Sequence, residues 1–392
     1  MLARGTRWVV ALAVVTLAVP AIAGADGTPV ISAHRAGGVS GFAENSLAAF
    51  ESAARGGETD IEGDVYATKD GRFVMSHDSP LRAPQCSGPH LGVSLRALTA
   101  AQVAEMDCFG QPVARVDQVL DAVRPYPAAT VRIEVKNEVN DSGALRTADA
   151  VNLARLFATA GMTQRSILQD SDWASTTRAV LAASPSQRVS ALSASITMAE
   201  VASARSLGVT DFSYVHTLAT GFWNQAIAAQ GLTSTVWTVN DTLRARVLRA
   251  EGVGTLITNI PATLRLALAD PASGCTLTPY TSTGVTRGTS LAGGAHTDPT
   301  APRLSPDGRV VEKARVRVRA LTSSGTASLR IAPQGTADGS QWEQPLAVGT
   351  TARTTVIEVP LGDAGRLRIR NASSRTVRLE VALVGGTVYD CP

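Results

Sequence analysis

The chain has 392 residues, more than one hydrophobic core usually covers, so we expect two domains. Its 36 basic and 33 acidic residues give a net charge of +3, and the expected loss of Arg4 and Arg7 with a leader leaves the two signs nearly balanced. Such a balance indicates no particular partner, and we expect no nucleic acid to bind.

Residues 1–25 have the pattern of a secretory signal peptide. A basic start with Arg4 and Arg7 precedes an apolar run from Trp8 to Ala23, and small residues end the run. This run is shorter than the roughly 20 residues of a membrane-spanning helix, and Pro20 interrupts it. We therefore expect a secreted or extracytoplasmic protein; a retained anchor is the alternative.

Four cysteines in an exported chain predict two disulfides. Cys86 and Cys108 lie close together in the sequence, whereas Cys275 and Cys391 bracket the final segment. We expect these two local pairings, and free buried thiols are the alternative.

Between residues 28 and 272, strand-like runs alternate with amphipathic helical stretches, the pattern of parallel βα units. The expected strands are Val30–Ala33, Thr59–Val65, Phe73–Ser76, Val131–Val135, Ser166–Leu168, Arg188–Ala191, Val209–Phe212, Ser234–Val239 and Thr255–Thr258. Lys69-Asp70-Gly71 is too short for a parallel crossover, so Phe73–Ser76 forms a hairpin outside the parallel count. The other eight strands are separated by expected helices such as Leu47–Ala54, Ala148–Thr159, Met198–Ser206 and Leu243–Ala250. This α/β pattern predicts a closed TIM (β/α)8 barrel, with an open doubly wound sheet as the alternative.

Two further segments depart from the barrel pattern. Residues 78–112 break its rhythm and are expected to form a small insertion, whereas residues 271–302 are rich in Thr, Ser, Gly and Pro and indicate a linker or loop-rich lead-in. Alternating runs then follow at Ala314–Ala320, Ser328–Ile331, Thr355–Val359, Arg366–Arg370 and Val377–Val381. Such short runs, separated by turn residues, predict a C-terminal antiparallel β-sandwich over residues 275–392.

Acidic residues are paired on the expected barrel strands. Glu62 and Asp64 are two residues apart, so their carboxylates project from one face of a strand, and Glu134 and Lys136 repeat this spacing. These residues fall at the carboxyl ends of strands, where such barrels place catalytic groups. Three carboxylates without a cysteine predict a site for one divalent cation, Ca²⁺ first, with Mg²⁺ or Mn²⁺ as alternatives. Ion pairs of these acids with Arg35, Arg132 or Lys136 are the structural alternative.

Two histidines, His34 and His77, flank the first acidic pair. A phosphate offers several oxygens to a cation and to donors such as Arg35 and Lys136. One imidazole would take a proton from the attacking hydroxyl or water, and the other would protonate the departing alkoxide. These residues therefore predict phosphodiester cleavage, whereas His90, His216 and His296 are expected to be structural.

The order of short motifs resembles the glycerophosphodiester phosphodiesterase family over residues 30–269. The motifs are Ala33-His34-Arg35, Glu44-Asn45-Ser46, Asp60-Ile-Glu62-Gly-Asp64-Val65, Thr68-Lys-Asp-Gly71, Ser76-His77-Asp78, Glu134-Val-Lys136, Trp237-Thr-Val-Asn240 and Ile257-Thr-Asn259-Ile-Pro261. The resemblance implies a TIM barrel with an insertion after its second strand, and metal-dependent hydrolysis of glycerophosphodiesters to glycerol 3-phosphate and an alcohol. By position it implies metal ligands at Glu62, Asp64 and Glu134, an acid–base pair at His34 and His77, and substrate-binding residues at Arg35, Lys136 and Trp237. Attack by the glycerol 2-hydroxyl through a cyclic phosphate and direct attack by water both stay open.

The sequence departs from the family pattern at four places. Ala36 stands where glycine usually follows His-Arg, Ala43 where proline usually precedes Glu-Asn, and Asn259 where an acidic residue is more usual; the loop between His34 and Glu44 is also a residue longer. Because the metal-binding and acid–base residues are complete, these changes bear on the substrate pocket more than on the reaction.

Arginines alternate along the expected sandwich strands, at Arg315, Arg317, Arg319, Arg330, Arg366, Arg368, Arg370 and Arg378. They predict either a cationic face that contacts anionic lipid or cell-surface polymer, or a solvated face whose charge is partly offset by Glu312, Glu358, Asp363 and Glu380. We favour the solvated face and expect a monomer.

Two other functions stay open at this stage. One is a phospholipase D-like lyase that acts on intact phospholipids and releases cyclic phosphates. The other is a non-catalytic surface-binding barrel protein, against which the presence of both His34 and His77 argues.

Overall fold

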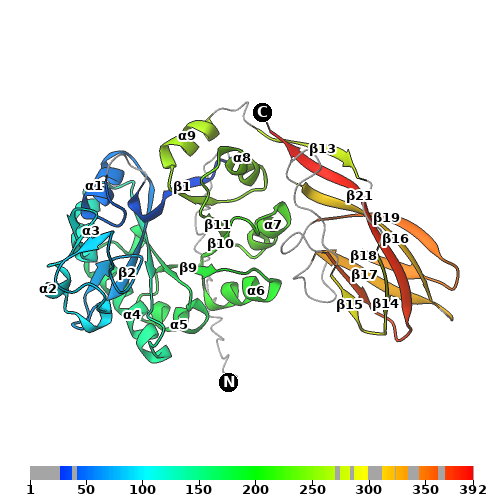
Figure 1. Ribbon diagram of the computed structural model, residues 1–392, viewed down its shortest axis with the longest axis horizontal. Coiled ribbons are helices and arrows are strands. Elements are labelled where there is room, and N and C mark those ends of the chain that lie inside the picture. The colour runs from blue at the N-terminus through cyan, green and yellow to red at the C-terminus, as the bar shows by residue number, and fades with distance from the viewer. Residues whose placement is uncertain are drawn as a thin grey trace, which may run out of the picture.

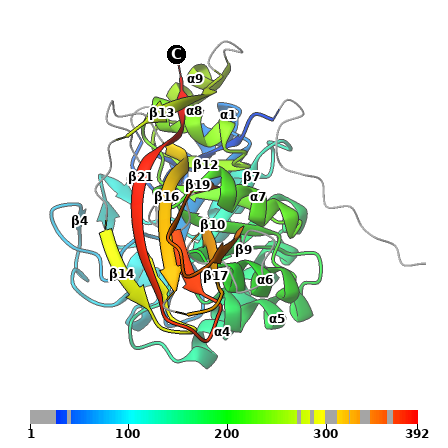
Figure 2. The same ribbon diagram turned by 90° about the vertical axis from the view of Figure 1, so that its right-hand side faces the viewer.

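The computed structural model describes residues 27–37, 42–269, 274–282, 287–298, 311–322, 324–333, 344–360 and 367–391. The expected signal peptide over residues 1–25 lies outside these described residues. Two bodies lie side by side, a barrel wrapped by helices and an all-β body (Figure 1). When the right-hand side of Figure 1 faces the viewer, the strands of the all-β body lie in front of the barrel helices (Figure 2).

Eight parallel strands close into a barrel. In spatial order they are β1 (Val30–Ala33), β12 (Thr255–Thr258), β11 (Thr233–Trp237), β10 (Asp211–Val215), β9 (Arg188–Ser193), β8 (Ser166–Asp170), β7 (Thr130–Val135) and β2 (Asp60–Ala67). Strand β1 pairs in parallel with both β12 and β2, which closes the sheet. Strand β3 (Phe73–Met75) pairs antiparallel with β2, as the short turn predicts. The TIM-barrel prediction is confirmed, and the open-sheet alternative is wrong.

Helices surround the barrel, and five of the eight described below begin after a residue whose side chain accepts a hydrogen bond from the first turn. They are α1 (Leu47–Arg55), α3 (Val116–Val123), α4 (Gly143–Thr159), α5 (Trp173–Ala183), α6 (Met198–Leu207), α7 (Gly221–Ala229), α8 (Thr242–Ala250) and α9 (Pro261–Ala269), with single turns at η1 (His34–Ala36) and η3 (Thr163–Arg165). The side chain of Ser142 accepts a hydrogen bond from the amide of Leu145, so α4 begins five residues before its predicted start at Ala148. Strand β10 begins two residues after its predicted start because the amide of Val209 still bonds to the carbonyl of Ala204, at the end of α6.

The insertion after β3 has its own small core. It contains β4 (Cys86–Ser87), η2 (Leu95–Ala97), α2 (Ala100–Val103), β5 (Asp107–Cys108) and β6 (Gln111–Pro112), and the three strands form a separate sheet. Its buried side chains pack against Tyr66 and Val74 of the β2–β3 hairpin. The insertion is thereby fixed to the strand that carries Glu62 and Asp64.

The all-β body consists of two antiparallel sheets, as a sandwich requires. The first contains β13 (Thr276–Thr281), β14 (Arg287–Leu291), β16 (Val311–Thr322), β19 (Arg353–Pro360) and β21 (Val377–Asp390). The second contains β15 (His296–Thr297), β17 (Ala327–Pro333), β18 (Gln344–Val348) and β20 (Leu367–Asn371). Alternate apolar residues of both sheets, among them Val318, Leu329 and Ile369, form one buried cluster that is distinct from the barrel core.

The prediction of a linker over residues 271–302 is wrong for its described part. Strands β13, β14 and β15 lie there, and β13 pairs with β21 at the edge of its sheet. An edge strand tolerates a proline such as Pro279 and carries mostly exposed side chains, so it lacks the apolar alternation that identifies a strand in a sequence.

Acidic partners face part of the arginine-bearing sheet. Arg315 lies opposite Glu358 and Arg319 opposite Glu380 across paired strands, with closest charged atoms 3.5 Å and 3.3 Å apart. These pairs favour the solvated-face interpretation. Arg366 and Asp363 lie outside the described residues.

Glu312 does not belong to this solvated face, so that part of the prediction is wrong. It is buried, and its carboxylate packs against Gly221 at the start of α7. A Cβ atom at position 221 would collide with this carboxylate, so the glycine lets the sandwich approach the barrel closely.

Both predicted disulfides, Cys86–Cys108 and Cys275–Cys391, are present. Disulfides persist in oxidising compartments, so the pairs indicate a non-reducing, extracytoplasmic environment. Within the described ranges, none of the helices combines the length and apolarity that a bilayer crossing demands.

Candidate active site

The eight residues predicted for the site meet in one cavity of about 340 Å³. It lies at the carboxyl ends of the barrel strands, and the predicted residues on its wall are His34, Arg35, Glu62, Asp64, His77, Glu134, Lys136 and Trp237. The remaining lining residues are Gln169, Leu192, Thr238 and Ile257.

Three carboxylates converge on one point of this cavity. Each of Glu62, Asp64 and Glu134 offers an oxygen within 4.8 Å of the other two. Glu62 and Asp64 are neighbours on one face of β2, and the register of β2 with β7 places Glu134 directly beside Asp64. This all-oxygen set has the composition that a hard divalent cation binds.

Close packing fixes the two acidic side chains of β2. A Cβ atom at Gly63 would lie 2.6 Å from Cζ of Phe50 and 2.9 Å from Oδ1 of Asn45, so any other residue here would displace these side chains. Asn45 donates from Nδ2 to Oδ2 of Asp64 and accepts from the Asp64 amide, both at 3.1 Å. Asn45 thereby sets the orientation of the Asp64 carboxylate.

Two cations lie against the acidic cluster. The backbone amide of Arg35 donates to Oε2 of Glu62 at 2.8 Å, and its Nε lies 3.5 Å from Oδ2 of Asp64. Lys136 Nζ lies 3.1 Å from Oε1 of Glu134 and 3.7 Å from Oδ1 of Asp64. Two cations for three carboxylates leave an excess of negative charge at the site.

Arg132, the third cation of the ion-pair alternative, is not a partner of these acids. Its buried guanidinium bonds to Asp60 and Asp211 inside the barrel, at 3.0 Å to each carboxylate. That part of the alternative is wrong.

Burial and mutual repulsion change the acidity of the cluster. Burial, followed by the charge of Asp64, raises the pKa of Glu62 well above its ordinary value and that of Glu134 to about 7. Burial lowers the pKa of Lys136, but the charges of Glu134 and Asp64 outweigh this effect and raise it overall. The carboxyl groups of Glu62 and Glu134 therefore hold protons at a pH where a free carboxyl is ionised.

His34 is held in one orientation by Asn259. The ring Nδ1 lies 2.6 Å from Oδ1 of Asn259, which can only accept, so Nδ1 carries the proton and Nε2 is left to accept one. Nε2 lies 4.0 Å from Oε2 of Glu62. Burial lowers the pKa of His34, and the hydrogen bond that the ring donates to Asn259 only partly offsets this, so the neutral ring is favoured.

Asn259 is itself positioned by Asn240. Oδ1 of Asn240 accepts from the backbone amide of Asn259 at 2.9 Å and from Oγ1 of Thr258 at 3.3 Å. The last two family-like motifs of the sequence therefore meet behind His34. Asn259, which stands where an acidic residue is more usual in the family, therefore affects the His34 imidazole as well as the substrate pocket.

His77 stands at the junction of two cavities. It lines the acidic cavity and also a neighbouring one of about 550 Å³, between the barrel mouth and the insertion. Its Nδ1 lies 2.9 Å from Oδ1 of Asp78. The second cavity is lined by Glu44, Arg82, Phe109 and the Cys86–Cys108 disulfide, among others.

Two neutral side chains on the wall of the acidic cavity each have a buried polar atom without a hydrogen-bond partner in the described part of the chain. These atoms are Nε1 of Trp237 and Oε1 of Gln169. Such groups are costly unless a ligand or solvent satisfies them. Trp237 was predicted for the substrate side. Gln169 was missed because its place beside Glu134 follows from the β7–β8 register, which no local motif reveals.

The backbone turns sharply where the first histidine motif leaves β1. Arg35 and Ala36 both have left-handed conformations, with φ of 53° and 52°. Glycine adopts this conformation without strain, which explains its usual presence after His-Arg in the resembling family. The turn directs the amide of Arg35 at Glu62.

A closed (β/α)8 barrel whose mouth holds three convergent carboxylates, able to bind a cation, and two imidazoles has the arrangement of a barrel hydrolase. Residues 34–263, more than half of the chain, match the glycerophosphoryl diester phosphodiesterase family. The chain belongs to this family and is a phosphodiesterase. The family resemblance noted in the sequence is confirmed.

Solved structures with the same fold are similar over the barrel. A candidate glycerophosphoryl diester phosphodiesterase from Silicibacter pomeroyi is 20% identical, with a TM-score of 0.58 over 64% of this chain and 96% of that one. A glycerophosphodiester phosphodiesterase from Parabacteroides distasonis is 21% identical, with a TM-score of 0.55 over 62% and 97%. An Oleispira antarctica phosphodiesterase, in complex with the product sn-glycerol-3-phosphate, is 18% identical, with a TM-score of 0.53 over 62% and 98%. Comparison with curated proteins gave no match.

Proposed function

We propose that the protein hydrolyses glycerophosphodiesters to glycerol 3-phosphate and an alcohol outside the cytoplasm. The observation that carries this proposal is the meeting of three carboxylates, two cations and two imidazoles in one cavity of about 340 Å³. Family membership supports the substrate class.

Glu62, Asp64 and Glu134 are proposed to hold one divalent cation, with Ca²⁺ preferred outside the cell. When bound, such a cation neutralises charge that develops on the phosphate oxygens. The raised pKa values of Glu62 and Glu134 fit this assignment, because added positive charge would restore both carboxylates.

The protein's own groups then divide the remaining work. Arg35 and Lys136 bind phosphate oxygens from opposite sides of the acidic cluster. The unpartnered indole N–H of Trp237 donates to the glycerol side of the substrate. These contacts orient the phosphorus between the two imidazoles.

We assign the two proton transfers by geometry. His34 has its proton on Nδ1 and a lowered pKa, so its free Nε2 takes the proton from the attacking hydroxyl. His77 borders the 550 Å³ cavity, which has room for the departing alcohol, and protonates that oxygen. Each transfer contributes about 10²–10⁴-fold to the rate.

Phosphorus NMR of the reaction products tests this function against the phospholipase D-like alternative. With Ca²⁺ and a glycerophosphodiester, we expect glycerol 3-phosphate to accumulate, and a transient cyclic phosphate would identify attack by the glycerol 2-hydroxyl. His34→Ala and His77→Ala should each lose turnover while Ca²⁺ affinity stays nearly unchanged. Persistent cyclic phosphate from an intact phospholipid, without glycerol 3-phosphate, would favour the lyase. No alcohol release from any glycerophosphodiester would favour a non-catalytic binding protein.

A further inference from the structure

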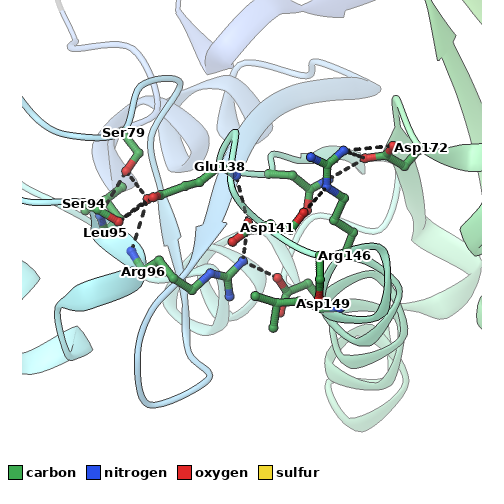
Figure 3. A network of polar contacts seen from close by, with 12 residues as sticks. Ser79, Ser94, Leu95, Arg96, Glu138, Asp141, Arg146, Asp149 and Asp172 are labelled. Carbon is green, nitrogen blue, oxygen red and sulfur yellow. Dashed lines mark hydrogen bonds and ion pairs between the residues drawn. The ribbon is translucent and has the colours of Figure 1, made fainter.

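A polar network joins the insertion to the loop that follows β7 (Figure 3). At its centre, the carboxylate of Glu138 points at the insertion and accepts from Oγ of Ser79 at 2.5 Å and Oγ of Ser94 at 2.5–2.6 Å. The backbone amide of Arg96 donates to the same carboxylate at 3.3 Å. One side chain from the barrel thus binds three places in the insertion.

The two ends of this contact lie next to the proposed machinery. Ser79 is two residues after His77, and Glu138 is two residues after Lys136. Ser79 also accepts from the amide of Leu95 at 2.9 Å, so its hydroxyl is fixed from both sides. Across the described part of the chain, neither the amide of His77 nor that of Ser79 takes part in a backbone hydrogen bond. Before His77, the Ser76 hydroxyl bonds to the backbone of Asp78, and after it the Glu138–Ser79 contact fixes the segment to the barrel.

Glu138 is in turn held rigidly from behind. Its backbone amide donates to Oδ2 of Asp141, in the same loop, at 2.8 Å. The guanidinium of Arg96 donates to Asp141 and also to Asp149, which belongs to α4. Arg146 extends the network to Asp172 at 3.1 Å (Figure 3). We call the contacts of Glu138 with Ser79, Ser94 and Arg96 the clamp. Because α4 supports the loop that carries Glu138, this clamp is more rigid than one on a free loop.

Lys136 does not depend on this clamp. Its ammonium is fixed by Glu134 and Asp64, on the strand side of the loop. Loss of the Glu138 contact would displace His77 more than Lys136 or the acidic cluster, because the partners lost are Ser79, just after His77, and Ser94 and Arg96 of the same insertion.

We propose that Glu138 is a positioning residue that sets the place of the His77 imidazole relative to the bound phosphodiester. The inference rests on the proposed function, in which His77 protonates the departing alcohol. A displacement of about 1 Å at a reacting group costs roughly 10²-fold in rate. Proton donation matters most for a poor leaving group, so the effect of Glu138 depends on the alcohol that departs.

The test compares two esters of glycerol 3-phosphate, one with ethanol and one with p-nitrophenol, which departs as a stable anion without a proton. For Glu138→Ala we expect kcat to fall about 10²-fold with the ethyl ester and only a few-fold with the p-nitrophenyl ester, with KM and Ca²⁺ affinity nearly unchanged. Ser79→Ala, which removes one bond of the clamp, should show the same leaving-group dependence with a smaller amplitude. Glu138→Gln keeps one acceptor oxygen and should recover part of the ethyl-ester rate.

Glu105→Ala is the matched control, because Glu105 is an exposed carboxylate of the same insertion whose partner is His90, 3.4 Å away. It should leave both substrates unaffected. Equal loss on both esters for Glu138→Ala and Ser79→Ala, or no loss on either, would overturn the positioning role. If His77→Ala shows the leaving-group dependence and the clamp variants do not, the clamp fails while the proposed function stands. Absence of wild-type turnover on both esters would instead refute the proposed function.

Discussion

The orientation of the His34 ring depends on Asn259, which is an amide where the family more often has an acid. The amide oxygen fixes the ring by accepting from Nδ1 but adds no negative charge, and burial keeps the pKa of His34 below its ordinary value. An imidazole with these properties is unprotonated, and ready to accept a proton, at a lower pH than a free histidine.

Asn259→Asp tests this arrangement. A carboxylate beside Nδ1 stabilises the imidazolium, so it should raise the pKa of His34 by about one unit or more. Because a base must be unprotonated to act, the acidic limb of the kcat/KM profile should move to higher pH by the same amount. The measurement is kcat/KM for one glycerophosphodiester from pH 4 to 9 in the wild type and the variant. An unmoved acidic limb, or one moved to lower pH, would show that His34 is not the base.

Sequence patterns identify the residues proposed to react or to bind the cation better than the residues that position them. His34, His77 and the three carboxylates are recognisable because their spacing on strands and their strand-end positions carry a chemical meaning. Asn45, Gln169 and Glu138 act across the fold through packing, strand register and a loop contact, so no local pattern points to their roles.

At the scale of elements, strand β2 carries two residues of the site and is closely packed on its opposite face. Glu62 and Asp64 face the cavity, while Gly63, between them, lies against Phe50, Met75 and Asn45. The absence of a side chain at position 63 lets α1 and β3 approach the strand from its other face.

Gly63→Ala should therefore destabilise the protein by about 1–3 kcal/mol, because the added methyl group overlaps Phe50 and Asn45. Displacement of Asn45 also frees the Asp64 carboxylate, so Ca²⁺ affinity should fall. Chemical denaturation and calorimetric titration measure the two effects. Gly143→Ala is a suitable control, since a Cβ at that helical position meets nothing within 4 Å and should be neutral or slightly stabilising. Wild-type stability in Gly63→Ala would contradict the packing account.

The elements themselves were predictable to different degrees. Buried parallel strands are continuous apolar runs, so the eight barrel strands and the β2–β3 hairpin follow from the sequence. Strands β13, β14 and β15 were missed because exposed Thr, Ser and Pro residues occupy them, and their pairing with β20 and β21 is decided by distant segments. Helix α4 was predicted too short because none of its first six residues is buried and its start is defined by the Ser142 cap.

The whole molecule has two separate hydrophobic cores, one in the barrel and one in the sandwich. All residues that line the acidic cavity belong to the barrel or, for His77, to the segment directly after β3. The described contact between the bodies is polar in part, with the buried Glu312 carboxylate against Gly221 at the start of α7. Burial and the neighbouring Glu312 charge raise the pKa of Tyr389, which lies at the same contact.

Deletion of residues 275–392 should therefore leave an active barrel. We expect kcat/KM for a soluble glycerophosphodiester to stay within about tenfold of the full chain, since the catalytic groups lie at the strand ends of the barrel. The thermal unfolding temperature should fall, because the α7 surface loses its cover. Glu312→Gln in the full chain removes the charge at the contact but keeps the sandwich domain, so it separates the effect of the contact from the effect of the domain. Complete inactivity of a folded truncated barrel would show that the sandwich completes the site.

The central claim is that Glu62, Asp64 and Glu134 share one divalent cation at the barrel mouth, between the two imidazoles. Anomalous diffraction from crystals grown with Mn²⁺ tests it most directly, because the ion's position is read without reference to activity. We expect one strong peak bounded by oxygens of these three carboxylates, and its loss in Glu62→Gln crystals. At saturating Mn²⁺, a peak only elsewhere, or none among the three carboxylates, would contradict the claim.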